Sequence, residues 1–186
     1  SDGTTLGTVM VKDIYSGSIS SNPGSLTNVN GTLFFDSNDG TSGIELWKSN
    51  GTTAGTVMVS DIYSGSSSSS PGNLVALNST TLLFSATNST YGYELWESDG
   101  TTTSLVKDIV SGAAGSGPSG LTKVGNIIFF SAYDATNGTE IWLTDGTNGG
   151  TALVKDIYPG TSNSSPAASG IDDINGIAYF SANDGT

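Results

Sequence analysis

The sequence of 186 residues contains no cysteine, no histidine and no arginine, and its only basic side chains are five lysines. The absence of cysteine excludes disulfide bonds and thiolate metal sites, and the absence of histidine excludes Ser-His-Asp and Cys-His triads. Without arginine there is no guanidinium clamp for a phosphoryl group. Most kinds of catalytic site are therefore excluded, and carboxylates are the main groups left for chemistry.

Positive charge is scarce. The 17 acidic residues give the chain a net charge of −12, so no basic face is available for phosphates or anionic lipid headgroups. No window holds about 18 consecutive apolar residues. We therefore predict no nucleic-acid partner and no membrane insertion. The chain does not open on a signal segment, and it contains 30 serines and 24 threonines, so we expect a mature or excised part of an exported protein.

What the sequence does contain is a repeat of roughly 48 residues. A Lys-Asp-Ile motif, with Ser for Lys in one copy, is centred on Asp13, Asp61, Asp108 and Asp156, at steps of 48, 47 and 48 residues. A second motif, Glu-Leu-Trp or Glu-Ile-Trp, includes all three tryptophans and is followed two residues later by Asn-Gly-Thr or Asp-Gly-Thr. Repeats of this period are typical of propellers, solenoids and linear arrays.

Each repeat is predicted to form four short strands, which in the first complete repeat are expected at 26–29, 32–36, 44–49 and 56–62. The apolar runs are short, rich in β-branched and aromatic residues, and bounded by Gly, Asn and Ser, which favours strands over helices. Asn30-Gly31 is a strong signal for a two-residue hairpin turn. The Ser/Gly/Pro stretch at 63–72 is expected to be a crossing loop that has little to bury.

The strands are apolar on both faces. Leu33 and Phe35 alternate with Phe34, so a sheet of such strands needs a neighbour on each side. We therefore predict an all-β fold of tandem four-stranded antiparallel meanders, about four repeats arranged like the blades of a β-propeller. An open linear β-repeat array is the alternative, because the local pattern is the same in both architectures.

The chain is expected to form one repeat domain over 1–186, or a fragment of a longer one. Its units are expected at approximately 1–24 (partial), 25–72, 73–119, 120–167 and 168–186 (partial). The partial units are predicted to add an outer strand at 8–14 and two inner strands at 171–174 and 177–182, which makes 15 strands. A Glu-Leu-Trp strand is missing between these partial units, so we expect the chain to continue into further repeats.

The three tryptophan motifs read ELWKSNGT at 45–52, ELWESDGT at 94–101 and EIWLTDGT at 140–147. They resemble the repeats of the ELWxxDGT repeat family, and the resemblance covers the whole chain, including the Lys-Asp-Ile segments and SANDGT at 181–186. Asn50, Ile141 and Ser60 are mild departures from the pattern. The resemblance implies a large secreted or cell-surface bacterial protein of many such units, and it implies no enzymatic activity.

The residues repeated in every unit are predicted to be structural. Each motif glutamate, at positions 45, 94 and 140, is expected to pair with a lysine of the next strand, such as Lys107 or Lys155. The motif aspartates are expected to cap turns or accept backbone hydrogen bonds. The tryptophans are expected to pack between repeats, with stacking on carbohydrate as the alternative. No catalytic or cofactor-binding residue is predicted.

Calcium is the one metal that the composition favours. Asp36, Asn38 and Asp39 precede Gly40, and closely spaced oxygens before a glycine turn are able to surround this ion. The spacing is shorter than in an EF-hand loop, and an Asx-rich hairpin turn explains the same residues without a metal. The next repeat has Thr87, Asn88 and Ser89 near this place, so a calcium site in every unit is not expected.

Three functions follow from these observations. The favoured one is a non-enzymatic extracellular or cell-surface module, structural or adhesive, whose partners are further repeats or copies of itself. The alternative is a calcium-dependent or carbohydrate-binding propeller module that recognises surface glycans through loops such as 40–44. A hydrolase would need two carboxylates about 5–10 Å apart in a cleft, and no motif points to such a pair.

Overall fold

The computed structural model describes residues 1–166 and 170–186. Within them the regular secondary structure is fourteen β-strands without a helix. The strands are β1 (Gly24–Val29), β2 (Thr32–Asn38), β3 (Ile44–Ser49), β4 (Val57–Ser60), β5 (Gly72–Ala76), β6 (Leu82–Asn88), β7 (Gly92–Ser98), β8 (Thr103–Lys107), β9 (Ser119–Val124), β10 (Ile127–Asp134), β11 (Gly138–Thr144), β12 (Ala152–Lys155), β13 (Asp172–Ile174) and β14 (Ile177–Tyr179).

The strands form four antiparallel sheets. Three have four strands in sequential order, β1-β2-β3-β4, β5-β6-β7-β8 and β9-β10-β11-β12, and the fourth pairs β13 with β14. The prediction of an all-β fold built from repeated antiparallel meanders is confirmed. Among the described residues no sheet closes on itself.

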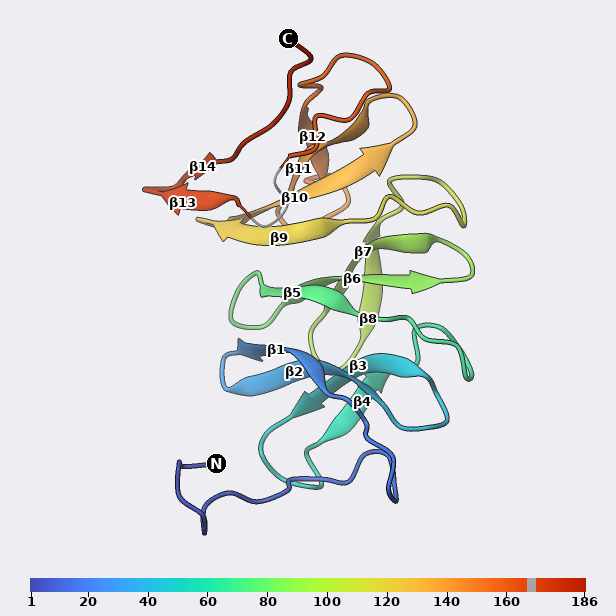
Figure 1. Cartoon of the computed structure of the whole chain (residues 1–186), viewed down its shortest axis with the longest axis vertical. Helices are drawn as coiled ribbons and strands as arrows, with labels where there is room; N and C mark the ends of the chain where they lie inside the picture. Colours follow the sequence, from blue (N-terminus) through green and yellow to red (C-terminus); the bar gives the residue numbers. More distant parts are fainter. Residues whose placement is uncertain (167–169) are drawn as a thin grey trace.

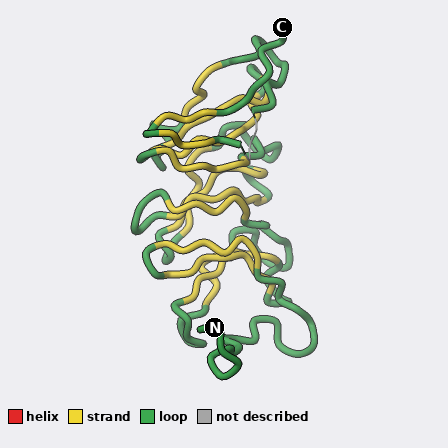
Figure 2. Tube along the Cα trace, turned by 60° about the vertical axis from the view of Figure 1, so that its left-hand side comes forward, coloured by secondary structure: helices red, strands yellow, loops and turns green. Residues whose placement is uncertain are grey.

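The sheets follow one another along the long axis of the molecule. Figure 1 shows the β1–β4 sheet near the N-terminus, then the two other four-stranded sheets, and the β13–β14 hairpin near the C-terminus. Figure 2 shows the same succession after a turn of 60°. The first strands of consecutive sheets are neighbours, because β1 contacts β5, β5 contacts β9, and β9 contacts β13.

The same irregularities recur in each four-stranded sheet. Opposite each Trp strand, the last strand carries one extra residue, which is Val59, Val106 or Val154. Such a bulge increases the local twist of the strand pair. The first strands of the three sheets also shift register, and Ser25, Asn73 and Gly120 have positive φ values of 52°, 52° and 64° there.

The hydrophobic core lies between the sheets. Leu82 and Phe84 of β6 pack with Val29, Phe34 and Leu46 of the preceding sheet. Leu83, between them in sequence, packs instead with the following sheet. Strand alternation therefore sends successive side chains into two different cores, as the two-faced pattern predicts. A third cluster joins Val124 and Ile141 to Ile171 of the last segment.

The expected strand at 8–14 is wrong, because the structure has no strand before Gly24. In each complete repeat this segment pairs with a Glu-Leu-Trp strand of the same repeat, and the sequence has no such strand before residue 8. Without that ladder the backbone of residues 8–14 gains no strand conformation. The other predicted strands are present, with ends that differ by up to a few residues, so residues 1–166 and 170–186 contain 14 strands rather than the predicted 15.

None of the described residues belongs to a helix long and apolar enough to span a bilayer.

Candidate functional site

The most distinctive polar groups of the molecule are three glutamates buried inside an all-β core. Glu45, Glu94 and Glu140 start the three tryptophan motifs, and each has an exposed fraction of 0%. A buried carboxylate is costly unless hydrogen bonds satisfy its oxygens. The partners of these carboxylates therefore show what the repeated glutamate does.

Glu45 accepts three hydrogen bonds from the segment that leaves its sheet. Ile62 N–H donates to Oε2 at 2.9 Å, Ser69 N–H donates to Oε1 at 2.9 Å, and the Ser69 hydroxyl donates to Oε2 at 2.6 Å. Ser69 is itself fully buried. The carboxylate thus fixes both ends of the loop that leads from β4 to β5, and we call this arrangement the glutamate clamp.

The clamp recurs at the two other tryptophan motifs. Glu94 accepts hydrogen bonds from Val110 N–H at 3.1 Å, Ser116 N–H at 2.9 Å and the Ser116 hydroxyl at 2.5 Å. Glu140 accepts them from Ile157 N–H at 3.2 Å, Ser164 N–H at 3.0 Å and the Ser164 hydroxyl at 2.5 Å. Burial raises the pKa of Glu45 and of Glu94 above the ordinary value, although their serine and backbone hydrogen bonds act in the opposite direction.

The clamped loop also joins consecutive sheets through its backbone. Ser70 N–H donates to Ile44 O of β3 at 3.1 Å, and Thr87 N–H of β6 donates to Ser69 O at 2.9 Å. The same bridge recurs where Tyr133 N–H donates to Ser116 O at 2.9 Å. The crossing loop therefore acts as a hydrogen-bonded link between two repeats. Most of the stretch at 63–72 is exposed or half-buried, in line with the expectation that it has little to bury, and the buried exceptions are Ser69 and Pro71.

The expected pairing of the motif glutamates with lysines is wrong. Lys107 lies opposite Leu95 rather than Glu94. Its side chain is therefore not on the face of the sheet that carries the Glu94 side chain. Its ammonium group donates to Thr151 O of the next repeat at 2.9 Å, and Lys12 donates to Thr56 O at 2.7 Å in the same way. The lysines thus link one repeat to the next through backbone carbonyls.

The aspartates of the Lys-Asp-Ile motifs do accept backbone hydrogen bonds from the following turn, which confirms that prediction. Each Oδ2 accepts a hydrogen bond from the glycine N–H four residues later, at 3.3, 3.1, 3.3 and 3.0 Å for Asp13, Asp61, Asp108 and Asp156. Their role is to close the turn in which the crossing loop begins.

The tryptophans pack between repeats, as predicted. Trp96 lies in the core shared by the first two sheets, and Trp142 lies in the core shared by the second and third. Trp47 lies at the other face of the first sheet, where the Lys12 ammonium is 5.7 Å from its ring centroid. The three indoles are only 6–7% exposed, and their N–H groups are buried without an acceptor. At this degree of burial none of the three presents a fully open ring face, as stacking on a sugar would require.

The loop proposed for calcium is an Asx turn in the structure. Asn38 Oδ1 accepts a hydrogen bond from Gly40 N–H at 2.7 Å, and Asp39 Oδ1 accepts from Thr41 and Ser42 N–H at 2.8 and 2.7 Å. Partial burial tends to raise the pKa of Asp39, but the hydrogen bonds from Ser42 and Thr41 outweigh it, and the pKa lies below the ordinary value.

The third calcium candidate, Asp36, lies on β2 opposite Leu46. In the described residues no group of three acidic side chains gathers there or elsewhere in a way that would hold a metal ion. Calcium binding at Asp36, Asn38 and Asp39 stays a prediction, which a calcium titration of the chain tests.

Sequence reasoning missed the serines of the clamp. Ser69, Ser116 and Ser164 each stand two residues before a proline, and Ser21 does so before Pro23. This Ser-x-Pro signal recurs with the period of the repeat, inside a stretch whose composition otherwise indicates an ordinary loop. A search for polar residues that recur at the repeat period would have found it.

No protein-family model matches the chain, and no curated protein matches it either. The geometry must therefore carry the functional argument by itself. Each of the three buried carboxylates already accepts three hydrogen bonds from its own chain and is closed to solvent. Such groups hold backbone in place, and in this structure they are not accessible to a substrate.

Proposed function

We propose that this chain is a non-enzymatic structural module, in which each repeat serves as the platform on which the next repeat stacks. The observation that carries the proposal is that the cores lie between sheets rather than within them. A sheet of this kind has an apolar face toward each neighbour, and its stability depends on that neighbour. The glutamate clamp and the lysine links reinforce the same junctions.

The burial of one repeated valine supports this role. Val106 is 4% exposed where the third sheet covers it with Trp142, whereas Val154 is 42% exposed, and the sheet that follows its own has only two strands among the described residues. The two valines occupy the same position in their repeats. A complete neighbouring sheet is thus what buries this face, and a chain of repeats gains stability by extension.

The architecture we propose is an open stack, with the β-propeller as its alternative. The three four-stranded sheets succeed one another along the long axis, and the N- and C-terminal ends lie toward its opposite extremes in Figure 1. A stack of this kind suits a scaffold or filament. Its partners would be further repeats or further copies of the chain.

The location we propose is the cell surface or the extracellular space, as the resemblance to the ELWxxDGT repeats implies. The absence of cysteine, the net charge of −12 and the abundance of serine and threonine support it. Antibody labelling of intact cells of the source organism tests this part. Labelling only after the cells are lysed would contradict it.

The stacking is tested by a double-length chain. Two copies are joined through the sequence of residues 42–48, SGIELWK, which supplies the tryptophan motif between SANDGT of one copy and SDGTT of the next. For an open stack we expect the maximum dimension from small-angle X-ray scattering to be close to double that of the single chain. A particle that stays compact would support ring closure and contradict the open stack.

The matched control joins the two copies through seven Gly and Ser residues. This linker has no apolar side chain to place between the sheets, so the two halves should move independently and melt as the single chain does. The SGIELWK-joined chain is expected to melt at a higher temperature, because its junction completes one further repeat. Equal melting temperatures would contradict the proposed role of the tryptophan strand.

A further inference from the structure

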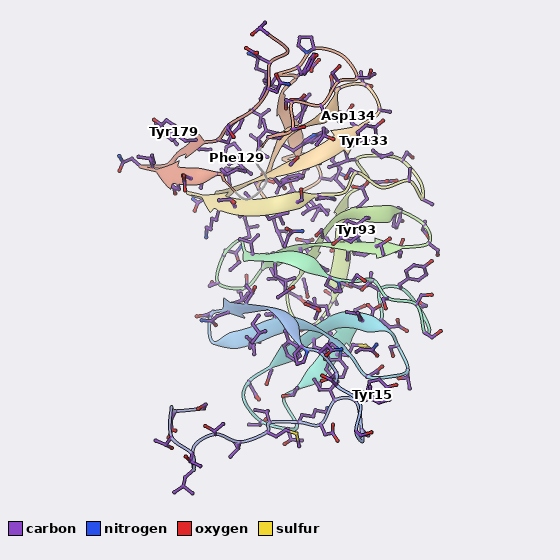
Figure 3. All side chains as sticks on the ribbon, viewed as in Figure 1. Tyr15, Tyr93, Phe129, Tyr133, Asp134 and Tyr179 are labelled. Carbon is purple, nitrogen blue, oxygen red and sulfur yellow. The ribbon has the colours of Figure 1, made fainter. Side chains whose placement is uncertain are left out.

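The molecule has an unfilled space at one repeat junction. A pocket of about 510 Å³, wide open to solvent, lies between the end of the second repeat and the β10–β11 loop of the third, and its wall includes Val110, Ala135, Asn137 and Trp142. Its volume lies within the range of about 300–1,000 Å³ that is usual for small-ligand sites. In Figure 3, Asp134 marks the start of this loop, further along the stack than Tyr93.

Aromatic rings fill the corresponding space at other junctions. The position of Val110 is Tyr15, Tyr63 or Tyr158 in the other repeats. Tyr15 and Tyr158 lie against the glycines of the facing loops, since a Cβ atom added to Gly40 or Gly185 would come within 2.5 or 2.7 Å of a ring carbon. Val110 is thus the only one of the four that lacks a ring.

At one other junction Tyr91 adds a second ring, at the position that Ser42 and Asn137 occupy in their repeats. Tyr91 packs edge-on against Trp96, with the ring centroids 6.3 Å apart and the planes at 66°. In the next repeat the residue at the position of Tyr91 is Asn137, and the tryptophan is Trp142. The pocket therefore lies where the junction between the first and second repeats places a phenol ring beside the indole.

We propose that this pocket binds a phenolic ring, presented either by a small molecule or by an exposed tyrosine of another chain. The apolar wall of Ile109, Val110 and Trp142 would receive the ring, as the equivalent wall receives Tyr91. Asp134 would accept a hydrogen bond from the phenol hydroxyl at Oδ2, which in this structure accepts one bond, from Asn137 Nδ2 at 2.8 Å. This site is independent of the stacking role proposed above.

The test uses p-cresol as the probe and two-dimensional ¹H–¹⁵N NMR of the full chain as the readout. We expect a saturable shift of one of the three indole N–H signals, that of Trp142, together with the amide signals of Val110 and Asn137. Assignment of the indole signals uses single Trp→Phe variants. The absence of saturable shifts at these groups would overturn the proposal.

Two variants make the test specific. Asn137→Tyr restores the ring found at Tyr91 and keeps the turn, because Tyr91 N–H and Asn137 N–H make the same Asx-turn bond. It should weaken p-cresol binding by up to about tenfold, because the introduced ring takes the place of the probe in its stacking contact. In reverse, the double variant Tyr63→Val, Tyr91→Asn should create a second site beside Trp96. Unchanged p-cresol binding by Asn137→Tyr would overturn the proposal, whether or not the double variant folds.

Two further probes identify the source and the class of ligand. If N-acetyltyrosinamide binds as well as p-cresol, a tyrosine of a partner chain is the source, whereas binding of p-cresol alone indicates a free phenolic compound. Methyl α-glucoside is the probe for sugars, the alternative class of ligand, because sugar rings also combine an apolar face with hydroxyl groups. Saturable binding of the glucoside without binding of p-cresol would overturn the phenol assignment.

Discussion

Glu94 shows at the scale of one residue how the fold tolerates a buried charge. Its carboxylate has no basic partner within the clamp, and three hydrogen bonds from Val110 and Ser116 replace the water it lost. Hydrogen bonds to a charged acceptor contribute more than neutral ones, and their donors become costly when the acceptor is removed. The three donors therefore depend on the glutamate as much as the glutamate depends on them.

The first prediction concerns the loss of this acceptor. Glu94→Ala leaves two backbone N–H groups and the Ser116 hydroxyl without a partner, so the free energy of unfolding should fall by at least about 1–3 kcal/mol. Glu97→Ala on the same strand is the matched control. Glu97 is partly exposed and accepts a single hydrogen bond from Ser104, at 3.0 Å, so the change should stay within about 0.5 kcal/mol. Urea unfolding measures both, and equal losses would contradict the clamp.

The second prediction concerns pH. Burial raises the pKa of Glu94 above its ordinary value of 4.5, so the folded state binds this proton more tightly than the unfolded state does. The stability that the proton contributes is fully present below pH 4.5 and is lost as pH rises through the raised pKa. Glu94→Gln has no such titration. We therefore subtract the unfolding free energy of Glu94→Gln from that of the parent. This difference should be largest at acid pH and should become smaller as the pH rises toward neutrality.

The comparison of the parent with Glu94→Gln separates the titration of Glu94 from that of the aspartates, whose pKa values are lowered rather than raised. Hydrogen bonds from Thr102 and Thr101 lower the pKa of Asp99, and hydrogen bonds from Thr147 lower that of Asp145. These groups contribute stability above the ordinary pKa that is lost as pH falls, and they do so equally in parent and variant. A difference between parent and variant that grows toward neutral pH would contradict the raised pKa of Glu94.

At the scale of the element, the crossing loop is the part whose conformation is most restricted. Its residue before the proline has a left-handed backbone at all four junctions, with φ values of 46°, 47°, 60° and 47° at Asn22, Ser70, Gly117 and Ser165. Only one of the four is glycine. The conformation aims the preceding serine at the glutamate, and the buried hydrogen bonds hold it against the local backbone preference.

The third prediction follows from that restriction. Ser70→Gly should raise the free energy of unfolding by up to about 1 kcal/mol, because relief of about 1–2 kcal/mol of left-handed strain exceeds the roughly 0.5–1 kcal/mol of extra chain entropy. The exposed Ser70 side chain makes no bond that the change would remove, and its N–H bond to Ile44 O is kept. Gly117→Ser at the equivalent position should change stability in the opposite direction. Thermal unfolding of both variants checks this, and a change of the same sign in both would contradict it.

At the scale of the whole molecule, stability should behave as a sum over repeats and junctions. Each core cluster uses residues from two consecutive sheets, and Leu82 and Leu83 belong to different clusters although they are neighbours in sequence. Mutations in one junction should therefore affect the next junction only weakly. A closed globular core would couple them much more strongly.

The fourth prediction measures this coupling with Ile128→Val, which lies in the same cluster as Leu83. Leu83→Ala with Ile128→Val should show an interaction energy of about 0.5–3 kcal/mol, because the two side chains belong to the same core cluster. Leu82→Ala with Ile128→Val is the matched control, and its effects should add within about 0.3–0.5 kcal/mol. Both leucines are fully buried on β6. Double-mutant cycles in urea decide, and equal coupling in the two cycles would contradict independent junctions.

The turns, the period of the repeat and all of the strands except the one expected at 8–14 could be predicted from the sequence. The reason is physical, because hydrophobic alternation, Asn-Gly turns and Asx caps act over a few residues and are repeated in every unit. The same alternation also showed that each sheet needs a neighbour on both faces. The positions of the tryptophans between repeats and of the aspartates at turns followed from these local rules.

The pairs of groups that meet across longer distances follow from the packing of the repeats and could not be predicted from the sequence. The glutamates reach Ser69, Ser116 and Ser164, 22 to 24 residues away, and Lys107 reaches a carbonyl 44 residues away. The spacing of the residues along the strands predicted that Glu94 would lie opposite Lys107. The bulge at Val106 instead places Lys107 opposite Leu95. The pocket beside Trp142 was hidden for the same reason, since its walls come from two repeats whose relative placement no local pattern encodes.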